Sequence, residues 1–152
     1  MTTFGQRSLS LAGLILACFG LSGCENDAAS YQIDGKDHAL VLIREQKFFW
    51  DDGVDQALVV NRMPDCQRRS FLKKGTAGAL KMEVYEMRPG IYALRQGKQW
   101  YLANTSDCEV NKADAPTSGV PGKLLGAFMY REEKLRFVPA DQIGSKSAKS
   151  KE

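Results

Sequence analysis

Apolar residues recur at every second position in short segments between residues 31 and 138, and turn-forming residues separate these segments. A period of two is the pattern of a β-strand that buries one face, whereas an amphipathic helix repeats its apolar residues every 3.6 positions. The turn signals recur about every 8 to 12 residues, which is typical of antiparallel sandwiches and barrels. The sequence therefore predicts an all-β fold, a single small antiparallel β-sandwich or barrel of about eight strands.

Several hairpin turns can be placed from their residues. Asp34-Gly35 separates the segments 31–33 and 38–43, and Asp-Gly is among the strongest hairpin signals. Three further hairpins share one form, in which an arginine ends one strand, two residues turn and a lysine opens the next strand: Arg44 to Lys47, Arg95 to Lys98 and Arg131 to Lys134. Like charges that face each other across two strands are unfavourable, so we expect these hairpin ends to lie in solvent.

The aromatic residues of two hairpins have a predicted place. The first of the Arg-to-Lys turns predicts a strand over 47–50 that pairs with 38–43, and because both of its faces are apolar we expect it at the centre of the fold. In the next hairpin, the alternation places Tyr92 and Tyr101 on one face and Trp100 on the other. We favour packing in the core for these aromatic residues over a surface that stacks on sugar rings.

The N-terminal segment has the layout of a secretory signal peptide. Arg7 precedes an apolar run from Leu9 to Leu21, and small residues follow the run. A membrane-spanning helix needs about 20 apolar residues, and this run is shorter. The ending Leu21-Ser22-Gly23-Cys24 resembles the lipobox of bacterial lipoproteins.

This resemblance implies a processing route and an address. Cleavage would fall between Gly23 and Cys24, the Cys24 thiol would carry a lipid, and the new amino group would be acylated as well. Two or more acyl chains on one residue are enough for stable membrane anchoring. An Asp after the lipidated cysteine retains Gram-negative lipoproteins at the inner membrane. Because Glu25 stands there, the resemblance implies an envelope lipoprotein of the outer membrane that faces the periplasm.

The cysteines predict one disulfide. Cys18 belongs to the signal segment and Cys24 would be lipidated, which leaves Cys66 and Cys108. An even pair in an oxidising compartment predicts a bond between them. It would close a loop of about 43 residues and stabilise the fold by roughly 4 kcal/mol in the chain-entropy view. A redox or metal pair has no support, since the chain lacks a Cys-x-x-Cys motif and has one histidine, His38.

The chain divides into four predicted parts: a signal peptide over 1–23, a short polar tether over 24–30, a β-domain over 31–140 and a disordered Lys/Ser-rich tail over 141–152. Residues 24–152 carry 20 basic and 18 acidic side chains, because the signal segment contributes one arginine and no acid. This near neutrality argues against nucleic acid as a partner.

No arrangement of residues indicates catalysis. Nucleophilic triads need a base, usually histidine, and His38 alternates with apolar residues in a predicted strand, where packing is the simpler role. Glu83 and Glu86 lie three apart in another predicted strand, so they point to opposite faces and do not form an acid–base pair. We therefore expect no enzymatic activity, no metal site and no cofactor other than the covalent lipid on Cys24.

The three Arg-to-Lys hairpin ends are the candidate binding surface. If they lie at one end of the domain, their six cations and three neighbouring glutamates give a local charge of +3. The residues are Arg44, Lys47, Arg95, Lys98, Arg131 and Lys134, with Glu45, Glu132 and Glu133. Such a patch fits an acidic envelope protein or an anionic envelope glycolipid, and a merely solvated rim is the alternative.

Together these observations predict a membrane-anchored envelope lipoprotein with a non-catalytic role in binding or in assembly. A lipoprotein inhibitor of a hydrolase such as lysozyme is the alternative, because the chain is similar in size and all-β form to membrane-bound lysozyme inhibitors. The charge argues against this alternative, since an inhibitor of a basic lysozyme should be acidic and this chain is slightly basic.

Overall fold

The computed structural model describes residues 26–48 and 50–144. The regular structure of these residues is almost entirely β, which confirms the predicted fold class, and it contains eleven strands where the sequence predicts about eight. The strands are β1 (Asn26–Asp34), β2 (His38–Glu45), β3 (Gly53–Arg62), β4 (Cys66–Phe71), β5 (Gly75–Thr76), β6 (Lys81–Arg88), β7 (Ile91–Gln96), β8 (Gln99–Asn104), β9 (Glu109–Ala113), β10 (Lys123–Arg131) and β11 (Lys134–Pro139). A short 3-10 helix, η2 (Ala140–Gln142), follows.

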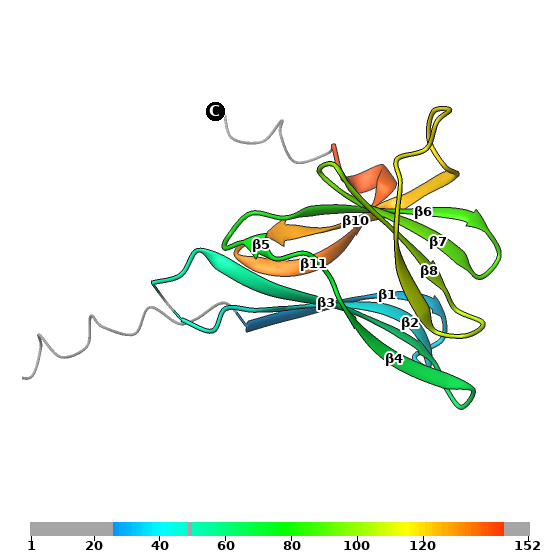
Figure 1. Ribbon diagram of the computed structural model, residues 1–152, viewed down its shortest axis with the longest axis horizontal. Helices are drawn as coiled ribbons and strands as arrows, with labels where there is room; N and C mark the ends of the chain where they lie inside the picture. The colour runs from blue at the N-terminus through cyan, green and yellow to red at the C-terminus, as the bar shows by residue number, and fades with distance from the viewer. Residues whose placement is uncertain (1–25, 49, 145–152) are drawn as a thin grey trace, which may run out of the picture.

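The strands form two antiparallel sheets, which Figure 1 shows as stacked layers. One sheet has the order β1-β2-β3-β4, with the short β5 paired to β3, and the other has the order β11-β10-β6-β7-β8-β9. Strand β1 packs beside β11 at one edge, and β3 and β4 pack beside β9 at the other. The two sheets therefore face each other as a sandwich rather than closing into a barrel.

The core lies between the two sheets and follows the predicted alternation. Leu40 and Leu42 from β2 and Leu58 from β3 are fully buried on the inner face of the first sheet. Their counterparts on the second sheet are Met82, Val84, Tyr92, Leu94, Tyr101, Ala103, Phe128 and Leu135. Each fully buried aliphatic side chain contributes about 1.5–3 kcal/mol relative to its exposed state.

The predicted faces of the β7–β8 hairpin are confirmed. Tyr92 and Tyr101 belong to the core between the sheets, whereas Trp100 packs with Tyr85 and Ala93 in a second, smaller cluster on the outer face. The six-stranded sheet is thus apolar on both faces near its centre.

The predicted strand over 47–50 is wrong. Strand β2 continues to Glu45, which pairs with Asp55 of β3, and the loop 46–52, described at 46–48 and 50–52, lies between them. The reason is the length of the competing segment: β3 offers eight residues that pair with all eight of β2, whereas 47–50 offers four. The exposed fractions of Phe48 and Trp50 are 50% and 69%, so the prediction that they pack in the core is also wrong.

Of the other two Arg-to-Lys hairpins, one has the predicted strand pairing and the other does not. Arg131 faces Lys134 as predicted, and Glu132 and Glu133 form the turn between them with φ of 52° and 63°. In the β7–β8 hairpin, Gln96 pairs with Gln99, so the turn is Gly97-Lys98 and the predicted pairing of Arg95 with Lys98 is wrong. Gly97 has φ of 58°, a left-handed value that glycine adopts without steric cost, which explains this one-residue shift of the turn.

The predicted domain boundaries change at the N-terminal side. Residues 26–30, which the sequence predicts as part of a tether, form the first half of β1 and pair with β2. The alternation of burial along β1, with Ala29 and Tyr31 facing inward, explains why this segment joins the sheet. The predicted signal peptide, Cys24 and most of the predicted tail (145–152) lie outside the described residues.

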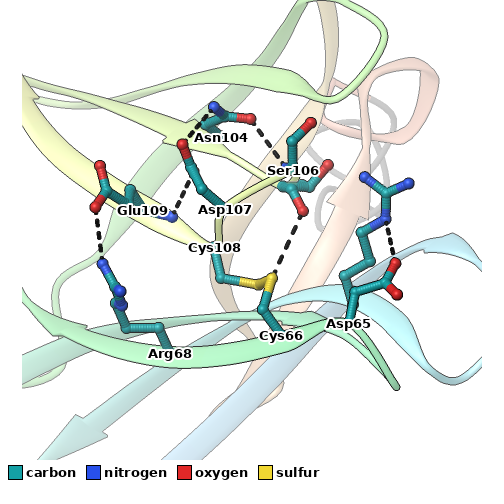
Figure 2. Close-up of a disulfide and its surroundings, with 10 residues drawn as sticks. Asp65, Cys66, Arg68, Asn104, Ser106, Asp107, Cys108 and Glu109 are labelled. Carbon is teal, nitrogen blue, oxygen red and sulfur yellow. Dashed lines mark hydrogen bonds and ion pairs between the residues drawn. A yellow bond between two sulfur atoms is a disulfide. The ribbon is translucent and has the colours of Figure 1, made fainter.

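The predicted disulfide is present and joins the two sheets at one edge. Cys66 opens β4 and Cys108 precedes β9, with their Cα atoms 6.0 Å apart. Figure 2 shows the turn that presents Cys108, in which the Asn104 and Asp107 side chains accept hydrogen bonds from the backbone N–H groups of Ser106 and Glu109. The bond therefore fixes β4 against β9 where no backbone ladder connects them.

Candidate functional site

The three Arg-to-Lys hairpin ends lie at the same end of the sandwich. Within the second sheet, the register places the end of β10 beside the start of β6, and the start of β6 beside the end of β7. Hydrogen bonds from Arg44 to Tyr130 and between Gln56 and Gln96 bring the end of β2 and the start of β3 to the same place. We call this end the hairpin pole, defined by the loop 46–52, the segment 72–80, the turns 97–98 and 132–133, and the start of β1.

Arg44 is fully buried beneath the hairpin pole, so the expectation that its side chain lies in solvent is wrong. Its guanidinium donates hydrogen bonds to the Tyr130 hydroxyl, at 3.2 Å, and to the Thr76 carbonyl, at 2.7 Å, and it lies 5.5 Å from the centre of the Tyr130 ring. The Tyr130 hydroxyl in turn donates to the Asp27 carboxylate at 3.1 Å. Arg44 is therefore an internal cross-link and is not available to a ligand at the surface.

A second polar pair, of buried Gln56 and half-buried Gln96, lies near Arg44. The side-chain amides of Gln56 and Gln96 exchange hydrogen bonds across the two sheets, at 3.1 and 3.2 Å. The Gln56 amide also donates to the Lys73 carbonyl at 2.7 Å. Because a buried polar group is costly unless it is paired, these contacts fix the backbone of segment 72–80 over the end of the core.

Segment 72–80 carries the chain from the first sheet to the second across the hairpin pole. Its backbone is held from both sides: Leu72 donates to the Gln56 carbonyl, and Lys73 donates to the Tyr101 hydroxyl of the other sheet. Gly75 lies against the side chains of Gln56 and Arg44, leaving no room for a Cβ atom. The packing therefore holds segment 72–80 by fixed contacts.

The surface of the hairpin pole contains a recess lined by lysines. It has a volume of about 370 Å³ and is bounded by Lys73, Lys74, Gly75, Thr76, Ala79, Gln96, Lys98 and Gln99. Lys98 is one of the predicted candidate residues, whereas Lys73 and Lys74 were not among them. Their position follows from the crossing of segment 72–80 over the pole, which no local pattern indicates. The three ammonium groups give the recess the chemistry of an anion site.

Beside the recess, Asp55 compensates part of the positive charge. Its carboxylate forms ion pairs with Lys47, at 2.8 Å, and with Lys74, at 3.2 Å. Hydrogen bonds from these two lysines lower the pKa of Asp55, and the hydrogen bond to Asp55 raises the pKa of Lys47. Lys73 and Lys98 have no ion pair within the described residues, so they are the cations of the recess that remain open to a ligand.

Arg95 is engaged on the outer face of the six-stranded sheet. Its Nε donates to the Glu83 carboxylate at 2.7 Å, and its guanidinium lies over the Trp100 ring. Tyr85 and Lys81 also contact Glu83, at 2.7 and 3.0 Å. Burial would raise the pKa of Glu83, but these hydrogen bonds and the charge of Arg95 outweigh it and lower the pKa; burial and the bond to Glu83 raise the pKa of Tyr85 to about 12.

The last predicted pair lies at the margin of the hairpin pole. Arg131 is half-buried and donates to the Ile143 carbonyl at 3.1 Å, whereas Lys134 is exposed. Of the six predicted binding residues, Lys47, Lys98 and Lys134 therefore have exposed side chains, and the other three are buried or engaged. The candidate surface keeps its predicted location but not its predicted composition.

The loop 46–52 adds an aromatic pair, Phe48 and Trp50, that the sequence predicts in the core. The rings of Phe48 and Trp50 are stacked, with centroids 5.0 Å apart and an interplanar angle of 18°. The loop borders the lysine recess, because Thr76 pairs with Gly53 and Ala77 donates to the Asp52 carbonyl at 2.9 Å. Exposed aromatic rings and open lysines thus lie at the same end of the molecule.

No family model, curated protein or solved structure matches this chain. Across residues 26–48 and 50–144, no helix is long and apolar enough to cross a membrane. Within the same part of the chain, no group of three His, Cys, Asp or Glu side chains is placed to hold a metal ion.

Replacing Gly75 with alanine tests the packing of segment 72–80. The new Cβ would lie 2.8 Å from Cδ of Gln56 and 2.9 Å from Nη2 of Arg44, so we expect the free energy of unfolding to fall by about 1–3 kcal/mol. Urea denaturation measures the change. Gly144→Ala is the matched control, because a Cβ at Gly144 meets nothing within 4 Å. Equal stabilities of the two variants would contradict the packing described here.

The acid dependence of stability tests the Glu83 cluster. The folded state lowers the pKa of Glu83 below its ordinary value of 4.5. The ionised carboxylate therefore contributes fully to the free energy of unfolding above pH 4.5, and this contribution is lost as the pH falls through the folded-state pKa. We expect Glu83→Gln to lower the free energy of unfolding by about 1 kcal/mol at pH 7. This loss is kept small by the solvent exposure of Arg95 and Lys81, and we expect it to shrink below about pH 4.

Thermal unfolding between pH 3 and pH 7 measures this dependence. Glu109→Gln, which removes an exposed ion pair to Arg68, is the control and should change little at any pH. A deficit of Glu83→Gln that stays constant down to pH 3 would contradict the role assigned to the carboxylate.

Proposed function

We propose that this protein is an envelope lipoprotein, anchored through acyl chains on Cys24, whose β-sandwich acts by binding and not by catalysis. The hairpin pole is its binding surface, and the ligand is an anionic group of the envelope. The lipobox residues Leu21 to Cys24 support the anchor, and the resemblance they carry favours the outer membrane, facing the periplasm.

The observation that carries the binding role is the lysine recess. Lys73 and Lys98 come from different parts of the chain and line one recess, and the buried contacts of Arg44 and Gln56 hold the segment that presents Lys73. A rigid support reduces the entropy that a binding surface loses when it engages a ligand. Ammonium donors of this kind bind phosphate and carboxylate groups. An anionic glycolipid carries phosphates, and an acidic envelope protein carries carboxylates.

The anchor is tested by replacing Cys24. In a Gram-negative host supplied with labelled palmitate, we expect the wild-type protein to incorporate label and to sediment with membranes. Cys24→Ala should incorporate none and should appear as an unprocessed precursor or as a soluble periplasmic protein. Cys18→Ala is the matched control, because it removes a cysteine of the predicted signal peptide and should be labelled like the wild type. Labelling of Cys24→Ala would overturn the proposed anchor.

A further inference from the structure

The start of β1 places the proposed anchor next to the hairpin pole. Asn26 pairs with Glu45 at the end of β2, so the first described residue already lies at the pole. Cys24 is two residues earlier in the sequence, and two residues span at most about 7 Å. If Cys24 carries the acyl chains, as the proposed function states, the hairpin pole is the end of the sandwich that meets the bilayer surface.

The loop 46–52 presents aromatic rings at this end. Asp51 shapes the loop: its carboxylate accepts a hydrogen bond from the Gly53 N–H at 2.8 Å, its carbonyl accepts one from the Gln46 side chain at 2.6 Å, and its own N–H donates to the Phe48 carbonyl at 3.1 Å. Figure 1 shows this loop, the start of β1 and β5 together at the left end of the molecule. The stacked rings of Phe48 and Trp50 expose apolar surface to water, which is unfavourable. Aromatic rings of this kind are favoured at the level of lipid headgroups.

The lysine recess lies at the same end of the sandwich as these rings. Lys73 and Lys98 are exposed there and are available to lipid phosphates, while Asp55 engages Lys47 and Lys74. The acids Asp51, Asp52 and Asp55 also belong to this region, so the hairpin pole is not strongly cationic as a whole. The presence of exposed aromatic rings and two open ammonium groups at one end, rather than net charge, therefore defines its chemistry.

We propose that the hairpin pole docks on the phospholipid surface of the membrane that holds the anchor. The rings of Phe48 and Trp50 enter the headgroup region, and Lys73 and Lys98 contact phosphates of anionic phospholipids. Together with the acyl chains, these contacts hold the long axis of the sandwich at a fixed orientation and turn the opposite end, with the β1–β2 and β3–β4 turns, away from the bilayer. This inference rests on the proposed function, because it uses the anchor at Cys24.

Tryptophan quenching tests the docking with the mature acylated protein in vesicles of phosphatidylethanolamine and phosphatidylglycerol. The phosphatidylglycerol carries bromine on its acyl chains close to the headgroup, so it quenches tryptophan at the interface. We expect the wild-type protein to lose about half of its fluorescence and Trp50→Phe, which retains the buried Trp100, to lose little. Because Trp50 is exposed, its replacement leaves the core intact, and far-ultraviolet circular dichroism checks the fold.

Three results separate the possible failures. Mass spectrometry of the same preparation shows whether Cys24 is acylated, and an unmodified cysteine would overturn the proposed function itself. With acylation in place, equal quenching of the wild type and Trp50→Phe would overturn the docking and leave the anchor standing. In the double variant Lys73→Gln/Lys98→Gln we expect Trp50 to be quenched less than in the wild type, and unchanged quenching would overturn the phosphate contacts.

Discussion

A buried guanidinium needs hydrogen-bond partners where it lies, and the two terminal nitrogens of Arg44 find them on groups from both sheets and from the segment that connects them. Its partners are the Tyr130 hydroxyl on β10 and the Thr76 carbonyl on β5, and Asp27 on β1 supplies a carboxylate through Tyr130. A hydrogen bond to a charged group contributes about 1.5–3 kcal/mol, so the loss of any one of these partners is costly. The shape of the hairpin pole depends on it.

The same contacts explain how a small domain presents a defined surface. Segment 72–80 packs Leu72 and Leu80 against the core, and Arg44, Gln56 and Tyr101 bind its backbone at three points. The absence of a side chain at Gly75 lets the backbone approach Arg44 and Gln56. At the far edge of the sandwich, the disulfide between β4 and the turn before β9 closes the sheets against each other. The lysine recess and the aromatic loop are built on this frame.

The sequence predicted what depends on local periodicity and missed what depends on contacts between distant residues. Strand faces, the Glu132-Glu133 hairpin and the cysteine pair follow from alternation, spacing and composition, and the structure confirms them. Arg44 falls on the same face of β2 as Leu40 and Leu42, so its inward direction was present in the alternation. Its partner Tyr130, however, is 86 residues away, and without that partner a buried arginine would be unfavourable. The candidate site shows the same limit, because Lys73 joins Lys98 only through the crossing of segment 72–80.

If the hairpin pole faces the membrane, backbone amides at that end of the molecule are shielded and those at the opposite end are not. Hydrogen–deuterium exchange of the acylated protein, measured in phosphatidylglycerol-containing vesicles and in neutral detergent micelles, compares the two ends directly. The account predicts slower exchange in vesicles for residues 46–52 and 73–79, with no change in the β1–β2 turn (35–37) or the β3–β4 turn (63–65). Equal exchange at the hairpin pole in both media, or slower exchange at the opposite turns, would contradict it.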